Sequence, residues 1–150
     1  MTDPVALFAA AVAGAAEDVD LVQACLAIAS GADPDLDPAP SLEALDRFAE
    51  GVDGLDGLRA RLFGELRFTG NTADYYDAEN SFLNRVLERR LGIPITLSVV
   101  TIEVGRRAGL DIQGIGMPGH FLVQDRATGA FLDPFHEGEV LDGAGCEALW

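Results

Sequence analysis

Apolar residues recur at helical spacing through the first 67 residues of the chain. Positions 4–29 are rich in Ala, Leu and Val, Pro4 suits the first turn of a helix, and Gly14 divides the segment into two predicted helices. A Pro- and Asp-rich loop over 31–41 follows, and Ser41 is the predicted N-cap of the next helix. Another helix is indicated by a leucine stripe, made by Leu55, Leu58, Leu62 and Leu66.

Residues 77–90 continue the helical pattern, with an apolar face made by Phe82, Leu83, Val86 and Leu87. Gly92 stands at the C-cap position predicted for this helix. The next segment, 95–104, is ambiguous. Its β-branched residues favour a strand, whereas Pro94 before it and Gly109 after it favour a helix.

After Gly109 the pattern changes to one typical of strands. It predicts three strands, over 112–117, 120–124 and 130–133, with a turn at Pro118 and Gly119 between the first two. The chain ends at Trp150 inside a segment typical of the first turn of a helix, which is compatible with a domain that continues further. The elements together predict an α+β fold.

Composition and charge exclude several classes of function. The chain has 150 residues, which suits one domain, and its formal net charge is −15. This acidic excess disfavours nucleic acid and anionic membranes as partners, because both carry negative charge. The basic residues are all arginine, so lysine-dependent chemistry is excluded. The apolar run over 5–16 is too short to span a bilayer, and we expect a cytoplasmic protein.

The cysteines and histidines form no recognisable metal motif. A four-ligand Cys/His zinc site would need Cys25, Cys146, His120 and His136 to converge, so we expect no metal and no cofactor. Two separated cysteines provide no disulfide framework, which favours a reducing compartment. Cys25 lies on an apolar helix face and is expected to be a small buried residue. His136 is predicted to be a loop residue.

The most informative polar pair is His120 and Asp133. His120 opens one predicted strand and Asp133 closes the next, so an antiparallel hairpin can place the two side by side. A carboxylate beside an imidazole fixes its tautomer and stabilises the imidazolium, as the orienting half of a nucleophilic triad does. The same pair would equally serve as a structural hydrogen bond between two strands.

Several ordered motifs of this chain resemble the transglutaminase-like superfamily, and in particular its bacterial SirB-type branch. They are residues 75–90, 92–98 and 105–110, and Pro118-Gly119-His120-Phe121. The resemblance implies a papain-like core, in which a buried central helix packs on an antiparallel sheet that bears His120 and Asp133. It also assigns 95–108 to the helix. We therefore expect a helical N-terminal part over 1–67 and a transglutaminase-like core over 68–150, joined in one compact unit.

The chain departs from the family pattern at the nucleophile. In the family a cysteine occupies the N-terminus of the central helix, whereas here that position falls at or beside Pro94, and Thr96 and Ser98 are the nearest hydroxyls. A hydroxyl gains much less than a thiol from a helix N-terminus. We therefore expect a non-catalytic binding or regulatory module. The alternative is a hydrolase or acyltransferase in which Thr96 or Ser98 acts with His120 and Asp133. A structural helper domain of a larger protein is a third possibility.

A group of arginines and asparagines forms the second set of candidate residues. The candidate binding residues are Asn80, Asn84, Arg85, Arg89 and Arg90. Salt bridges to nearby acidic residues would explain why these arginines, together with Arg106 and Arg107, are clustered. The alternative is that their guanidinium groups bind an anionic or carboxylate-bearing partner. The expected partner is accordingly a protein or a small polar ligand.

Overall fold

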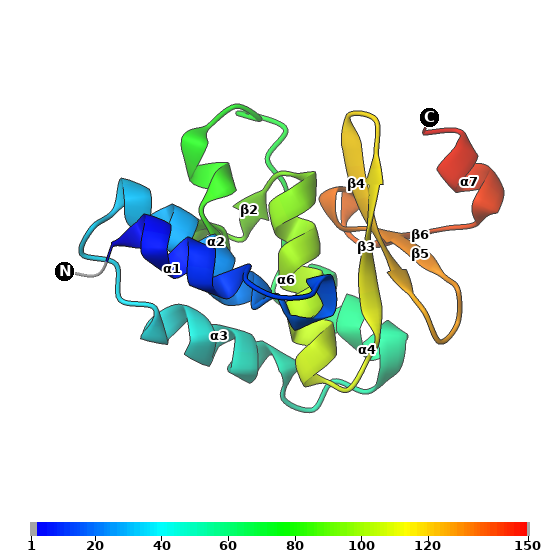
Figure 1. Cartoon of the computed structure of the whole chain (residues 1–150). Helices are drawn as coiled ribbons and strands as arrows, with labels where there is room; N and C mark the ends of the chain where they lie inside the picture. The colour runs from blue at the N-terminus through cyan, green and yellow to red at the C-terminus, as the bar shows by residue number, and fades with distance from the viewer. Residues whose placement is uncertain (1–2, 150) are drawn as a thin grey trace.

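The computed structural model describes residues 3–149, and α6 (Pro94–Arg107) runs through its centre (Figure 1). Four helices surround α6, together with a four-stranded sheet that packs against it. These helices are α2 (Leu21–Ala32), α3 (Ala39–Ala49), α4 (Gly54–Arg59) and α5 (Leu83–Arg89). The predicted α+β fold is confirmed, and so is the helical assignment of the ambiguous segment after Pro94.

The sheet is an antiparallel meander with its strands in chain order. Its strands are β3 (Ile112–Met117), β4 (His120–Asp125), β5 (Phe131–Asp133) and β6 (Glu139–Leu141). Met117 pairs with His120, so Pro118 and Gly119 form a two-residue turn, and Gly119 takes the positive φ of 68° that a type II turn requires after its proline. The first three strands were predicted. β6 was not, because Glu139 and Val140 are both exposed and show no alternation.

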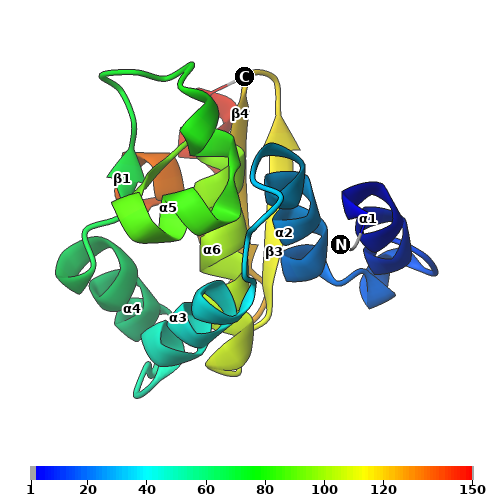
Figure 2. The ribbon, with the colours of Figure 1, turned by 90° about the vertical axis from the view of Figure 1, so that its left-hand side faces the viewer.

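The N-terminal segment divides at Gly14 as predicted. α1 (Pro4–Ala11) and α2 are separated by η1 (Ala16–Asp18), and Gly14 has a φ of 97°. The carboxylates of Asp3 and Asp20 cap α1 and α2 by accepting hydrogen bonds from backbone N–H groups of their first turns. α1 packs on the outer side of α2 (Figure 2).

The prediction that Ser41 caps the third helix is wrong. α3 begins two residues earlier, at Ala39, because Pro40 is compatible with the first turn of a helix. The Asp37 carboxylate accepts a hydrogen bond from the Ala39 N–H. Ser41 lies buried within the first turn.

The prediction of one continuous helix over 77–90 is also wrong. Phe82 adopts an extended conformation, with φ −102° and ψ 115°, and separates η3 (Ala78–Ser81) from α5. The left-handed residue that ends α5 is Arg90, with φ 61°, and not Gly92. Gly92 instead belongs to β2 (Leu91–Gly92), which pairs in parallel with β1 (Thr69–Gly70). A Cβ at Gly92 would lie 2.8 Å from Thr96 Oγ1, so glycine is needed for close approach.

The hydrophobic core lies between α6, the helices around it and the sheet. Leu97, Val100 and Val104 of α6 are at most 1% exposed. Leu58 and Leu62, on α4 and its π-helical continuation η2 (Ala60–Glu65), are fully buried, as the leucine stripe predicted. One apolar cluster joins residues from both 1–67 and 68–150.

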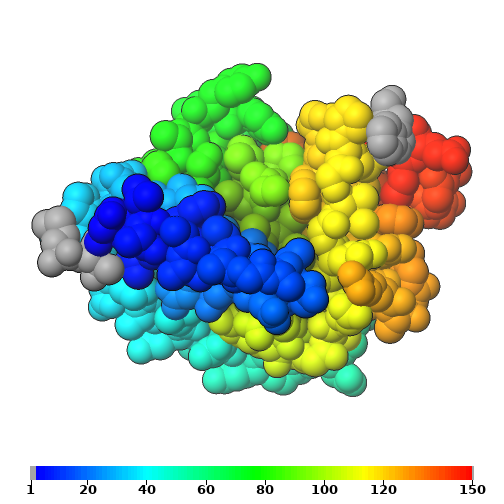
Figure 3. All heavy atoms as spheres, in the orientation of Figure 1, coloured from blue at the N-terminus to red at the C-terminus, as the bar shows by residue number. Residues whose placement is uncertain are grey.

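The C-terminal part of the chain extends beyond the sheet. η4 (Pro134–His136) connects β5 to β6, and α7 (Gly143–Glu147) follows β6. In the space-filling view, the blue and cyan segments of α1, α2 and α3 occupy the left and lower part of the molecule, and the β3–β4 hairpin and α7 occupy the right (Figure 3). No helix within residues 3–149 has both the length and the apolar character that a membrane span requires.

Candidate functional site

The structure brings His120 and Asp133 into direct contact. His120 begins β4, Asp133 ends β5, and the His120 Nε2 lies 2.8 Å from the Asp133 Oδ2. The aspartate side chain is 3% exposed and the histidine side chain 14%. The predicted hydrogen bond between adjacent antiparallel strands is therefore confirmed.

Asp133 is held in place by the turn that follows it. Its Oδ1 accepts hydrogen bonds from the backbone N–H groups of Phe135, at 3.2 Å, and His136, at 3.3 Å. Asp133 is thus the N-cap of η4, and Pro134 occupies the first position of that turn. Because Oδ1 is engaged by the backbone, Oδ2 is left to face the imidazole.

His136 joins the same carboxylate, which sequence reasoning missed. Its Nδ1 lies 2.8 Å from Asp133 Oδ2, the oxygen that also contacts His120. The expectation that His136 is a loop residue is corrected. His136 is the last residue of η4, and its ring contacts Asp133, the N-cap of the same turn. An aspartate followed by proline, with histidine three residues after the aspartate, was the available signal, because Asp and Pro together predict the start of a helical turn.

The hydroxyls near the expected nucleophile position do not contact His120. Thr96 Oγ1 donates a hydrogen bond to the Asn80 carbonyl oxygen, at 2.7 Å, and accepts one from the Ile93 N–H, at 3.2 Å. Ser98 Oγ is fully buried without a hydrogen-bond partner in the described part of the chain. Within residues 3–149, no hydrogen bond joins His120 to a hydroxyl or thiol.

The two cysteines are poor nucleophiles. Cys25 packs against the hydrophobic core as expected, but it is only partly buried. Its burial, together with the negative charge of Glu103, raises the pKa of the thiol to about 11, so little thiolate forms near neutral pH. Cys146 lies in α7, where partial burial and Asp142 raise its pKa.

A series of aromatic contacts leads from the imidazoles to the surface. The Phe135 ring packs edge-on against both His120 and His136, with ring centroids 6.3 and 5.1 Å apart. Tyr75 packs edge-on against Phe135, at 5.8 Å, and against Tyr76, at 5.3 Å. Tyr76 is 93% exposed. We call these five side chains the aromatic surface.

Asn80 holds the loop that carries the two tyrosines. Its side-chain Nδ2 donates hydrogen bonds to the carbonyl oxygens of Asp74 and Tyr75, and its Oδ1 accepts one from Asn71 Nδ2, at 3.0 Å. Asn80 is fully buried, so it positions the loop from within. Its predicted part in binding would accordingly be indirect.

The arginines are engaged mainly by acidic residues of this chain. Arg85 pairs with Glu79 and Glu88, and Arg89 pairs with Asp77 at 3.1 Å. Arg106 and Arg107 both reach the buried Glu103, and Arg107 also pairs with Asp46. The salt-bridge interpretation is confirmed for these four arginines. Direct binding by Arg85 and Arg89 stays a prediction.

Arg90 behaves differently from the other four. Its guanidinium carbon lies 4.9 Å from the centroid of the Phe48 ring and 5.3 Å from that of Phe68. It donates hydrogen bonds to the carbonyl oxygens of Leu87 and Leu66. Burial and the nearby Arg47 lower the Arg90 pKa. Arg90 therefore contributes to packing between α3, α5 and the chain before β1.

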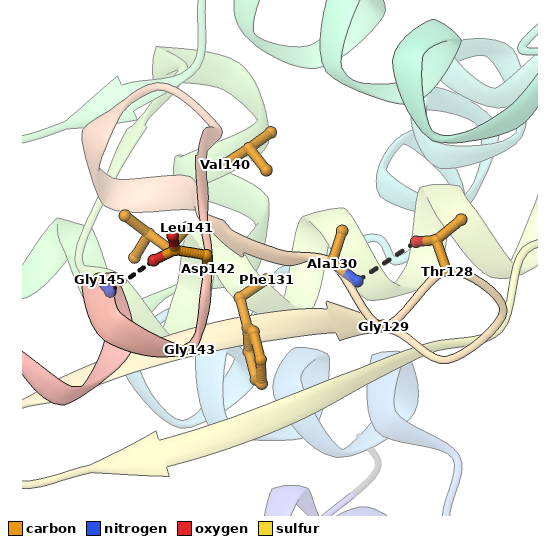
Figure 4. Close-up of a pocket in the computed structure, with 9 residues that line it drawn as sticks. All are labelled: Thr128, Gly129, Ala130, Phe131, Val140, Leu141, Asp142, Gly143 and Gly145. Carbon is orange, nitrogen blue, oxygen red and sulfur yellow. Dashed lines mark hydrogen bonds between the residues drawn. The ribbon is translucent and has the colours of Figure 1, made fainter.

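The surface outside the His–Asp cluster is hollowed in several places. Asn84 lies between two surface depressions. Its side-chain Oδ1 is buried and has no hydrogen-bond partner among the described residues. The binding role of Asn84 stays a prediction. An open pocket also lies between the loop after β4 and the start of α7 (Figure 4). Asp142 in this pocket is occupied in capping α7 through the Gly145 N–H, and none of the candidate site residues lines it.

Comparisons with known proteins identify the family. The model of the transglutaminase-like superfamily matches residues 24–150, and the chain belongs to this superfamily. The predicted membership is confirmed. No solved structure matches the chain.

Curated relatives come from bacteria and animals. A UPF0162 protein of Xylella fastidiosa is 51% identical over 83 residues, which cover 54% of this chain and 30% of the relative. A UPF0162 protein of Pseudomonas aeruginosa is 30% identical over 131 residues, covering 80% of this chain and 48% of the relative. F-box only protein 21 of Mus musculus is 36% identical over 105 residues, which cover 63% of this chain and 17% of the relative. The chain thus spans less than half the length of these relatives, and the UPF0162 matches support the bacterial branch.

Proposed function

We propose that this chain is a non-catalytic, transglutaminase-like binding module that recognises a protein partner. The observation that carries the proposal is the use of the Thr96 hydroxyl within the fold. This hydroxyl donates its proton to the Asn80 carbonyl oxygen and so is not presented to His120. A catalytic hydroxyl must lie within hydrogen-bond reach of its general base.

The remaining nucleophiles support the same proposal. Ser98 Oγ is fully buried and unpaired within the described residues, and Cys25 has a pKa of about 11. His120 and Asp133 can therefore orient a polar group, but within residues 3–149 no activated nucleophile stands beside them. The competing function, acyl transfer through Thr96 or Ser98, requires a hydroxyl that contacts His120.

The aromatic surface supports recognition of a protein. Interfaces are enriched in Tyr and Phe, and the energetically important residues are often aromatic side chains that become buried on binding. Tyr76 is 93% exposed and packs against Tyr75, which in turn packs against Phe135. The acidic chain, with a net charge of −15, favours a partner with a basic surface. A cytoplasmic location is part of this proposal.

The catalytic half of the proposal is tested by covalent labelling. Intact protein is exposed to a fluorophosphonate and to an activated ester, and adducts are located by mass spectrometry. We expect no stable adduct on Thr96 or Ser98. An adduct on either residue that disappears in His120→Ala would establish the hydroxyl enzyme instead.

The binding half is tested by a matched pair of variants. Tyr76→Ala removes the exposed ring of the aromatic surface, whereas Ile28→Ala removes a side chain on α2 that is 51% exposed. Proteins retained by the wild type and by Ile28→Ala should be lost from Tyr76→Ala. Equal retention by both variants would show that the aromatic surface does not bind them.

A further inference from the structure

We propose that His120, Asp133 and His136 form a binding site for a divalent transition-metal ion such as Zn²⁺. The three side chains offer His120 Nε2, Asp133 Oδ2 and His136 Nδ1, and these atoms all lie within 4.8 Å of one another. Two imidazoles and a carboxylate are a donor set that Zn²⁺ and Co²⁺ bind, whereas Ca²⁺ and Mg²⁺ prefer oxygen ligands.

The spacing of the donors fits one ion. With metal–ligand bonds of about 2.0–2.2 Å, the ligands of a tetrahedral site lie roughly 3.3 Å apart. Both imidazole nitrogens are 2.8 Å from Asp133 Oδ2. Each nitrogen is thus slightly closer to the carboxylate oxygen than a shared ion requires, and the two nitrogens lie within 4.8 Å of each other. An ion between the three atoms would replace the two hydrogen bonds by three coordinate bonds.

The surrounding structure prepares the ligands for coordination. Asp133 is almost fully buried and its Oδ1 is fixed by the N–H groups of Phe135 and His136, so Oδ2 points at the histidines. Such supporting hydrogen bonds are typical of metal-binding carboxylates. For each imidazole to present a lone pair, its proton must sit on the other ring nitrogen. Neither His120 Nδ1 nor His136 Nε2 makes a hydrogen bond within residues 3–149, so both can carry it.

The site is open on one side. The His136 side chain is 55% exposed, whereas the side chains of His120 and Asp133 are 14% and 3% exposed. Solvent therefore reaches the cluster past His136, which gives an ion a path of entry. Three protein ligands leave a fourth tetrahedral position to water or to a donor atom of a partner. The sequence-based expectation of no metal site considered only Cys and His ligands, and it could not find this cluster because the third ligand is an aspartate.

The site is tested by titrating tag-free protein with ZnCl₂ in a calorimeter and with CoCl₂ under visible spectroscopy. We expect one ion per chain and a spectrum of four-coordinate Co²⁺. His136→Ala and His120→Ala should each weaken Zn²⁺ binding by at least about tenfold, since losing even an outer-shell partner typically costs 10–100-fold. His136 is half-exposed, so its variant should keep the wild-type melting temperature without metal.

Two controls separate this cluster from other ligands. Glu137→Gln changes the neighbouring carboxylate, whose partner is Thr69, and should bind Zn²⁺ as the wild type does. A variant with Cys25→Ser and Cys146→Ser should also bind normally. Absence of saturable binding, binding unaffected by both histidine variants, or binding lost with the cysteines would each overturn the site. The proposal does not depend on the proposed function, because the readout is the bound ion and not labelling or partner retention.

Discussion

Thr96 and Ser98 are two hydroxyl residues of one buried helix with opposite hydrogen-bonding states. Thr96 Oγ1 joins the N-terminus of α6 to the Asn80 carbonyl and to the Ile93 N–H. Ser98 Oγ is buried without a partner among the described residues. Because an unpaired buried polar group is costly while a paired one contributes modestly, the two positions should respond differently to loss of the hydroxyl.

Thr96→Val keeps the side-chain shape and leaves the buried Asn80 carbonyl oxygen unpaired. We expect it to lower the free energy of unfolding by about 1–3 kcal/mol, measured by urea denaturation. Ser98→Ala is the matched control and should be neutral or slightly stabilising. Equal losses in both variants would show that Ser98 makes a hydrogen bond comparable to that of Thr96.

At the scale of single residues, the sequence predicted one half of the His–Asp cluster and missed the other. The order of His120 and Asp133 across a hairpin was sufficient, because neighbouring antiparallel strands bring such residues together. His136 was missed because its contact depends on the one-turn helix after Asp133, which a three-residue segment hardly reveals. The engagement of Thr96 was equally hidden, since its partner lies 16 residues away along the chain.

Among the secondary-structure elements, β1 and η4 depend on each other through one close contact. A Cβ added at Gly70 would lie 2.4 Å from atoms of the Phe135 ring, a distance that side chains cannot tolerate without a shift. Phe135 is the middle residue of the turn that carries His136. The absence of a side chain at Gly70 therefore allows η4 to lie against β1.

Gly70→Ala should displace Phe135 and destabilise the fold by about 1–3 kcal/mol, as overpacking usually does. Gly64→Ala is the matched control, since no atom lies within 4 Å of its added Cβ. That change should be neutral or stabilising by up to about 1 kcal/mol, because alanine restricts the unfolded chain. Thermal melts of both variants measure the difference, and a Gly70→Ala melt identical to that of the wild type would contradict the contact.

The elements were predictable where periodicity and end signals agree. β3 alternates between more and less buried positions, and the turn at Gly119 has suitable residues. The segment 77–90 was wrongly predicted to be one helix, because its apolar spacing continues through Phe82 although the backbone there is extended. The segment after Pro94 could not be assigned from its residues alone, since tertiary burial outweighs the strand preference of its β-branched side chains.

For the molecule as a whole, stability rests on the apolar surroundings of α6. Val104→Asp would place a charge where the side chain is fully buried, and we expect a loss of at least about 3 kcal/mol or complete unfolding. Ile95→Asp is the control on the same helix, because Ile95 is 45% exposed and lies in the first turn, where the dipole favours a carboxylate. Circular dichroism melts should show a large loss only for Val104→Asp.

The three hydrogen bonds of the Asn80 side chain have a consequence for the cost of recognition. A loop that becomes ordered only on binding loses conformational entropy at that moment, and this loss reduces affinity. Asn80 ties the Tyr75 loop to the body of the protein before any partner is present. The two tyrosines are thus presented on a pre-organised support, so more of the interaction free energy they provide would remain available as affinity.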